Sequence, residues 1–165
     1  MPCYEDVVAM WRSFEISSSA SLAQHLENHR ILFAYNSNKI ENENTSYNDV
    51  REIVDRGRVV NYTGDVRTLF EIQNQKDAYG FLIRAFQKRV PITEKFVKKV
   101  HRLLTKETYD AYRYQQGERP GEYKKHNYET SRNEVGALPE DVAEKLSELL
   151  TKLAESPLLL WSGQA

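Results

Sequence analysis

The sequence predicts an all-α protein, and three observations favour that class. Apolar residues recur at helical spacing through most of the 165 residues. Only seven glycines and five prolines interrupt the chain, and most of them lie between periodic segments. One stretch, residues 107–137, lacks this period, and within it we expect a small β-hairpin near residues 121–135. The expected fold is therefore a bundle of about six helices with one hairpin.

The first half of the chain predicts three helices. Apolar stripes favour a short helix over residues 5–15 and a longer one over residues 20–36. A cluster of Asn and Ser at 36–38 is expected to end the second helix. Ser46, with an acidic residue three positions later, is typical of a capping box, and Gly57 is placed to end that third helix.

The second half predicts three more helices. A long helix begins at Asp65 and is stopped by Pro91, and Thr93 then begins the next. Pro139, followed by two acidic residues, opens the last helix. We expect the apolar faces of these helices to form one core, which contains Phe81, Leu82, Phe86, Phe96, Val100, Leu103 and Leu146.

Composition excludes several classes of protein. The chain has 23 basic and 24 acidic residues, a formal net charge of −1, so a general electrostatic nucleic-acid binder is not expected. Cys3 is the only cysteine, which excludes an intrachain disulfide and a cysteine-based zinc site. No apolar stretch approaches the roughly 18 residues of a membrane span, and the first residues do not resemble a signal peptide. We expect one domain, residues 1–165, in the cytoplasm, with neither nucleic acid nor membrane as a partner.

General catalytic motifs are absent from the sequence. There is no Gly-x-x-x-x-Gly-Lys phosphate loop and no Gly-x-Gly-x-x-Gly turn. His25 and His29 have a spacing that suits zinc, but no third ligand is evident, so we interpret them as core or surface residues. His101 lies beside an apolar stripe and is interpreted as structural. These patterns predict no catalytic residue and no metal site.

One segment carries a more specific pattern. In Asn36–Thr45, Ser37 is followed after three residues by Glu41 and then Asn42. This arrangement resembles the inhibitory motif of the Fic (Fido) family, which is Ser or Thr, three residues, Glu, then Gly or Asn. Further along, Gly121-Glu122-Tyr123-Lys124 resembles the Gly-x-Tyr-Arg that opens the family's substrate-binding flap, with lysine in place of arginine. The resemblance spans about residues 20–155 in the family's order.

The resemblance implies a Fic-like helical bundle with a small β-hairpin flap. Residues 20–56 correspond to the inhibitory-helix region and residues 65–155 to the N-terminal part of the Fic core. The family's catalytic signature, His-x-Phe-x-(Asp/Glu)-Gly-Asn-Gly-Arg-x-x-Arg, is missing, since no histidine follows His126. We therefore expect a single truncated domain that is inactive alone and has no cofactor of its own. Intact members move AMP from ATP to a protein hydroxyl, with ATP and magnesium as cofactors.

The resemblance also implies roles for particular residues. Ser37, Glu41 and Asn42 would be inhibitory, because the family's glutamate pairs with the last arginine of the signature and disturbs the pose of ATP. The flap would bind a target protein by β-augmentation. Its residues are Gly121, Tyr123, Lys124, Lys125, His126, Asn127, Tyr128 and Glu129.

Three classes of function remain open. The first is a truncated Fic protein, and the second is a regulatory module that offers Glu41 in trans to a separate Fic enzyme. The third is an unrelated all-helical interaction protein. The expected partners are a target protein or a Fic enzyme. The apolar tail at Leu158–Trp161 also predicts self-association.

Overall fold

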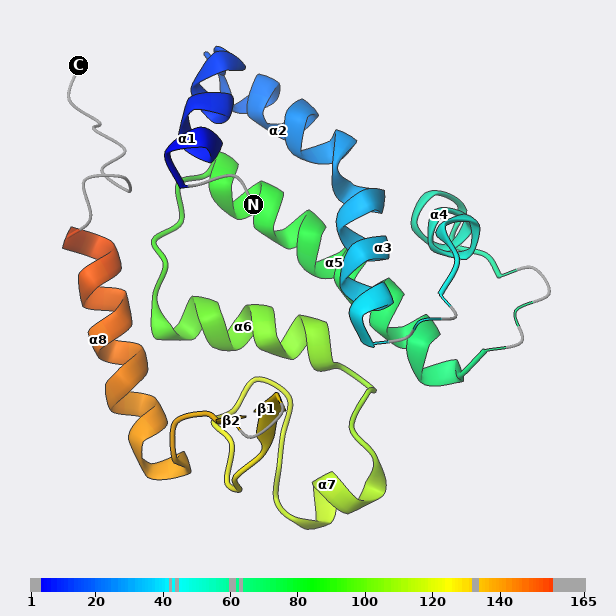
Figure 1. The fold of residues 1–165 in the computed structure, drawn as a ribbon, viewed down its shortest axis with the longest axis vertical. Coiled ribbons are helices and arrows are strands. Elements are labelled where there is room, and N and C mark those ends of the chain that lie inside the picture. The colour runs from blue at the N-terminus through cyan, green and yellow to red at the C-terminus, as the bar shows by residue number, and fades with distance from the viewer. Residues whose placement is uncertain are drawn as a thin grey trace.

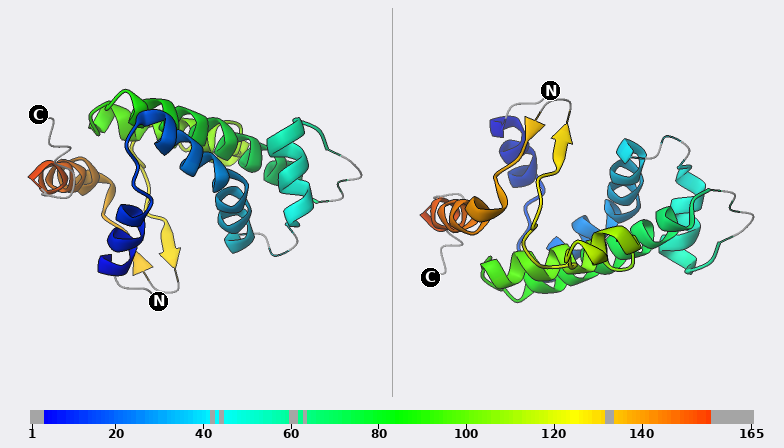
Figure 2. Two further views of the ribbon diagram at one scale, coloured as in Figure 1. Left: turned by 90° about the horizontal axis from the view of Figure 1, so that it is seen from above. Right: turned by 90° about the horizontal axis from the view of Figure 1, so that it is seen from below.

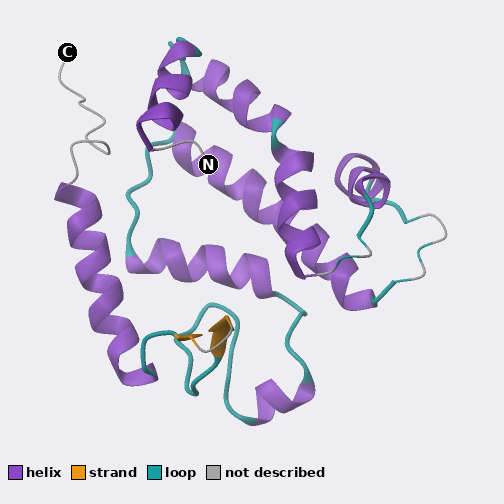
Figure 3. Cartoon of the chain, viewed as in Figure 1, coloured by secondary structure: helices purple, strands orange, loops and turns teal. Residues whose placement is uncertain are grey.

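The computed structural model describes residues 4–41, 43, 45–59, 62, 64–131 and 134–155. Within them the chain is mostly helical, with eight α-helices, one 3-10 turn and one pair of short strands (Figures 1 and 3). The helices are α1 (Tyr4–Ser13), α2 (Ser19–Asn28), α3 (Arg30–Glu41), α4 (Tyr47–Arg56), α5 (Val66–Gln87), α6 (Glu94–Thr105), α7 (Ala111–Gln115) and α8 (Val142–Glu155). The 3-10 turn is η1 (Pro139–Asp141), and the strands are β1 (Glu129–Ser131) and β2 (Glu134–Val135).

Helix α5 is the central element of the fold. It packs against α2, α3 and α4 along its length and against α6, which follows it in the chain. Figure 1 shows α6 running below α5, with α8 next to the first turns of α6, and Figure 2 shows α8 at one end of the molecule. Asp65 caps the start of α5 and Thr93 caps the start of α6, as predicted, because each side chain accepts a hydrogen bond from a backbone N–H of the first turn.

The best-buried cluster lies where α3, α4 and α5 meet. It consists of Ala34, Val50, Ile53, Val54 and Ile72, with Ile31, Tyr35 and Leu69 packed against it. The predicted core lies elsewhere, on α5, α6 and α8, and is only partly formed. Phe96 is buried there, Phe86 is 37% exposed, and Phe81, Leu82, Val100, Leu103 and Leu146 are half-buried. The prediction identified apolar faces correctly but not which of them have neighbours on every side.

Two helices replace the single helix predicted over residues 20–36. The chain breaks at His29, the C-cap of α2, and α3 then continues to Glu41. The expected break at 36–38 is wrong. Asn38 is buried there and its side-chain amide donates to the Ala34 carbonyl, 2.8 Å away, so the polar residue is satisfied inside the helix.

Helix α4 begins and ends as predicted. The Ser46 hydroxyl accepts from the Asp49 N–H at 3.1 Å, and Gly57 ends the helix with a left-handed φ of 62°. Val50, Ile53 and Val54 form its buried face. The apolar face of α4 therefore packs against α3 and α5.

The segment between α6 and α8 holds an antiparallel strand pair within the predicted range of residues 121–135, but only in the later part of that range. Residues 121–128 contain no strand, and the strands lie later, with β1 antiparallel to β2 in a short, irregular register. Helix α7 was not predicted, because its Tyr-Arg-Tyr sequence has no apolar period. Asp110 caps it by accepting from the Arg113 N–H at 2.7 Å.

Helix α8 starts as predicted, after the 3-10 turn at Pro139, but it has no buried residue. Among the described elements it contacts only α6 and that turn. Residues 156–165, which include the apolar tail predicted to self-associate, lie outside the described residues. No described helix combines the length and the apolar character needed to span a bilayer.

Candidate functional site

Glu118 is the one charged side chain that is buried among the described residues, at 4% exposure. Its Oε1 atom accepts from the Lys125 backbone N–H and from the Tyr128 hydroxyl, each at 2.9 Å. The same atom lies 3.2 Å from Nδ1 of His126. One carboxylate oxygen therefore contacts three residues of the segment from 125 to 128.

Burial alone raises the pKa of the Glu118 carboxyl, because a charge is poorly solvated in the interior. The hydrogen bonds from Lys125, Tyr128 and His126 outweigh that effect, and the pKa is lowered from its usual value. Glu118 is thus ionised at neutral pH although it is buried. Buried charges that persist in this way are concentrated at functional sites.

A second anchor joins this segment to α6. The backbone N–H of Gly121 donates to Nδ1 of His101 at 2.9 Å. Burial lowers the pKa of His101, so the ring is neutral at neutral pH. Because Nδ1 accepts the hydrogen bond from Gly121, the proton of the neutral ring is on Nε2. Gly121 has a φ of +82°, and a Cβ atom there would lie 2.7 Å from Cβ of Arg102. Only glycine fits this approach of the loop to the helix.

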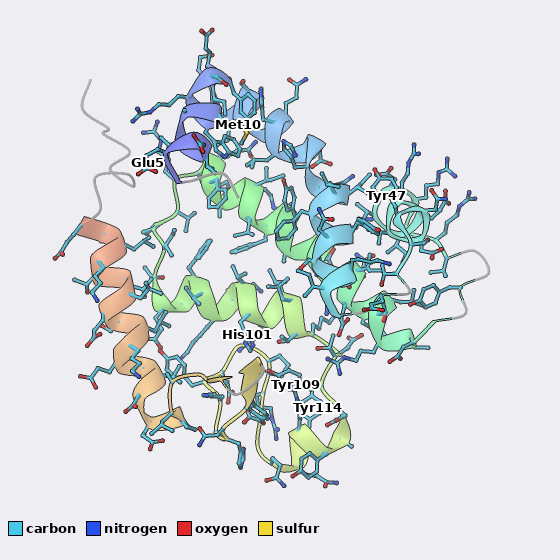
Figure 4. The ribbon with its side chains drawn as sticks, viewed as in Figure 1. Glu5, Met10, Tyr47, His101, Tyr109 and Tyr114 are labelled. Atoms are coloured by element: carbon cyan, nitrogen blue, oxygen red, sulfur yellow. The ribbon has the colours of Figure 1, made fainter. Side chains whose placement is uncertain are left out.

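The segment and its neighbours line an open pocket of about 550 Å³, which we call the tyrosine pocket. Figure 4 shows His101 on α6 and Tyr109 and Tyr114 nearby, on the α7 side of the molecule. Three tyrosines line the pocket, together with apolar residues of α6 and α8. They are Tyr109, Tyr123 and Tyr128, and the apolar residues are Val97, Val142 and Leu146.

Two cations lie over these tyrosine rings. Cζ of Arg113 is 5.0 Å from the ring centre of Tyr109 and 5.3 Å from that of Tyr128. Nζ of Lys98 is 3.7 Å from the ring centre of Tyr123. At these distances the rings attract the cations and hold them in the pocket wall.

A second pocket, of about 460 Å³, lies between α3, α5 and the chain after α6, and we call it the α3 pocket. Its polar lining includes Ser37 and Asn38 of α3 and Arg67, Glu71 and Gln75 of α5. Arg67 is engaged by Glu71 at 2.8 Å, and Oε1 of Gln75 is buried without a hydrogen-bond partner among the described residues. Tyr109 and Arg113 line both pockets, so the two adjoin there.

The predicted inhibitory residues have different outcomes. Ser37 is half-buried and lines the α3 pocket, in a helical turn rather than at the predicted helix end. Glu41 is the last residue of α3, and its side chain lies outside the described residues, as does Asn42. The inhibitory roles of all three remain predictions.

The predicted flap residues form an irregular segment that folds around Glu118. Tyr123, Lys124 and Tyr128 line the tyrosine pocket, and Gly121 is buried against α6. Lys125, His126 and Asn127 are exposed, and Glu129 is the first residue of β1. The backbone N–H of Lys125 is already bound by Glu118, which leaves one donor fewer for strand addition. Target binding by these residues remains a prediction.

Sequence reasoning missed Glu118, Tyr109 and Arg113, and it assigned His101 a structural role only. The local signal was an isolated acid between Gly117 and Gly121 in a tyrosine-rich, aperiodic stretch. Both glycines have positive φ, a backbone conformation that other residues rarely adopt, so the path of this loop depends on glycine at both positions.

The described residues contain no group of three or more His, Cys, Asp or Glu side chains that could hold a metal ion. His25 is instead engaged locally, with Nδ1 3.1 Å from the Ser21 carbonyl and its ring against Phe14. We derive no metal-assisted step for this site.

Comparison of the chain with protein-family models, with curated proteins and with solved structures found no match.

Proposed function

We propose that this chain is the regulatory and target-binding part of a Fic-type protein adenylyltransferase. Enzymes of that class move AMP from ATP to a hydroxyl of a protein. In this proposal the chain transfers no AMP alone, because it carries neither the signature histidine that would act as the base nor the Gly-Asn-Gly turn that would hold phosphates.

The observation that carries the proposal is the adjacency of the two regions that resemble the family. Ser37, the first residue of the inhibitory pattern, lines the α3 pocket. Tyr123, Lys124 and Tyr128, from the segment that resembles the flap, line the tyrosine pocket. These stretches are more than 80 residues apart in the sequence, yet their pockets share a wall. An inhibitory element and a target-binding element need this proximity if both act on one reaction centre.

The expected inhibitory action is electrostatic. Positions 37 and 41 are four residues apart, which is the spacing that places two residues on one face of a helix. A carboxylate at position 41 that enters the arginine fork of a Fic enzyme would occupy the donors that a phosphate of ATP needs. The alternative function, a non-catalytic module that acts in trans on a separate Fic enzyme, uses the same contact.

The test is inhibition in trans. A Fic enzyme that lacks its own inhibitory helix is mixed with this chain, and AMP transfer to its target is measured at several chain concentrations. We expect inhibition by the native chain and its loss in Glu41→Gly and Glu41→Gln. A charge-assisted hydrogen bond contributes about 1.5–3 kcal/mol, so the inhibition constant should rise roughly ten- to a hundred-fold.

Glu43→Gln is the matched control, since Glu43 is exposed and lies two residues further on. It should inhibit as well as the native chain. Equal inhibition by the native and Glu41→Gln chains would show that the carboxylate is not the agent. AMP labelling of a target by this chain alone would contradict the proposal that it lacks catalytic function.

A further inference from the structure

The guanidinium of Arg113 is held in an unusual way. Its Cζ atom lies over two aromatic rings at once, those of Tyr109 and Tyr128. No carboxylate among the described residues lies within ion-pair distance of it, and no described group accepts a hydrogen bond from its side chain. A guanidinium held by aromatic rings and without a carboxylate partner keeps N–H groups with which a planar anion can pair.

The tyrosine pocket has the size and lining of a small-molecule site. Its volume of about 550 Å³ is within the range of about 300–1,000 Å³ that such sites occupy. Val97, Val142, Leu146 and the aromatic rings supply most of the wall. A few polar groups in a mostly apolar pocket fix the orientation of a ligand, while the apolar wall supplies contact area.

The charges of the wall favour an anion over a cation. A cationic ligand would need tyrosine faces, and Arg113 and Lys98 already occupy them. The carboxylate of Glu118 is engaged by three donors, and Lys98 is paired with Glu94 at 2.7 Å. Glu122 and Lys124 line the pocket as well, so its wall holds three cations and two carboxylates. Among these cations Arg113, which lies over two tyrosine rings, has no carboxylate partner among the described residues and is placed to pair with an anionic ligand.

The side of the wall formed by the segment after α7 is held in place before any ligand arrives. Glu118 holds the segment from Lys125 to Tyr128, and His101 holds Gly121. A site that is already ordered loses less entropy on binding, which favours a small ligand with few contacts.

From these observations we propose that the tyrosine pocket binds a small carboxylate with an aromatic or aliphatic body. The carboxylate takes the N–H edge of Arg113, and the body lies against Val142 and Leu146. This ligand site does not depend on the proposed Fic-type function.

The test uses the full chain, with phenylacetate as the probe and phenylacetamide as its neutral counterpart. Each is titrated into the 15N-labelled protein, and amide shifts are followed by NMR. We expect saturable shifts at Gly121, Ala137 and Val142, with phenylacetate binding at least about ten-fold more tightly, since a charge-assisted pair is lost in the amide. Equal affinities, shifts elsewhere in the chain, or no saturation by about 10 mM would overturn the proposal.

Three variants separate the anchor from the pocket. Arg113→Met and the pocket-filling Leu146→Trp should each weaken phenylacetate binding at least about ten-fold, and Arg113→Lys should weaken it less. Arg51→Met, on α4 and remote from the pocket, is the matched control and should bind normally. Normal phenylacetate binding by a folded Arg113→Met chain would refute the assignment. Normal binding by both single variants Arg113→Lys and Leu146→Trp, each of them folded, would refute it as well. This outcome is independent of inhibition in trans, which tests the proposed function alone.

Discussion

Replacing Glu118 by alanine removes the acceptor around which residues 125–128 fold. The Lys125 amide and the Tyr128 hydroxyl, both 2.9 Å from Oε1, lose a charged partner. His126 counts for less, because its side chain is 45% exposed and can turn to water. Hydrogen bonds to charged groups contribute about 1.5–3 kcal/mol each, and the lower end for two of them gives a loss of about 3 kcal/mol at pH 7.

Thermal unfolding followed by circular dichroism measures this loss. For a chain of this length each kcal/mol shifts Tm by roughly 2–4 °C, so we expect Tm of Glu118→Ala to fall by about 6–12 °C. The fold lowers the pKa of this carboxyl. Its stabilising effect is therefore complete above the unfolded pKa of about 4.3 and is lost as the pH falls through the folded pKa. The Tm gap between the native chain and Glu118→Gln should be constant from about pH 6 to 8 and narrow below about pH 4.

Glu122→Ala is the control for this prediction. Glu122 is exposed on the same segment, so its loss should change stability by no more than about 0.5 kcal/mol. A Glu118→Ala chain as stable as Glu122→Ala would refute the reasoning. So would a gap between the native chain and Glu118→Gln that widens as the pH falls.

Three further substitutions test the fold by thermal unfolding. Gly121→Ala should destabilise by more than about 1 kcal/mol and by more than Gly57→Ala, because both glycines have positive φ but only the first meets a neighbour, Arg102. Asn74→Ala removes an amide that donates to two carbonyls at the end of α6, at 2.6 and 3.2 Å, and should cost about 1–3 kcal/mol. Ile72 is fully buried, so Ile72→Ala should cost about 2–5 kcal/mol and Ile72→Val only about 0.5–1.5. Equal stabilities within any of these comparisons would contradict the packing described.

Local chemistry explains which parts of the fold could be predicted from the sequence. Ser46, Asp65 and Thr93 each satisfy N–H groups of the turn that follows, so a few neighbouring residues determine where α4, α5 and α6 begin. The break at His29 could not be found in this way, because no glycine or proline marks it and the apolar pattern continues across it.

The site was harder to predict because its contacts join distant positions. Glu118 is satisfied by residues seven to ten positions away, and Gly121 by His101, twenty positions earlier. No periodic pattern encodes such pairs. The spacing of Ser37 and Glu41 can be seen in the sequence, but the position of Ser37 near Tyr109 and Arg113 depends on the packing of the helices.

The small number of contacts made by α8 has a consequence for local unfolding of the protein. A helix that buries no side chain, with Leu149 59% exposed, is held to the rest of the protein by few apolar contacts. Such an element can detach in a sub-global opening while α3, α4 and α5 stay folded. Native-state hydrogen exchange should then divide the chain into two cooperative units: amides of α8 exchange at low free energy, and those of α4 and α5 only on global unfolding. Because Val142 and Leu146 line the tyrosine pocket, each opening of α8 also removes one wall of that pocket.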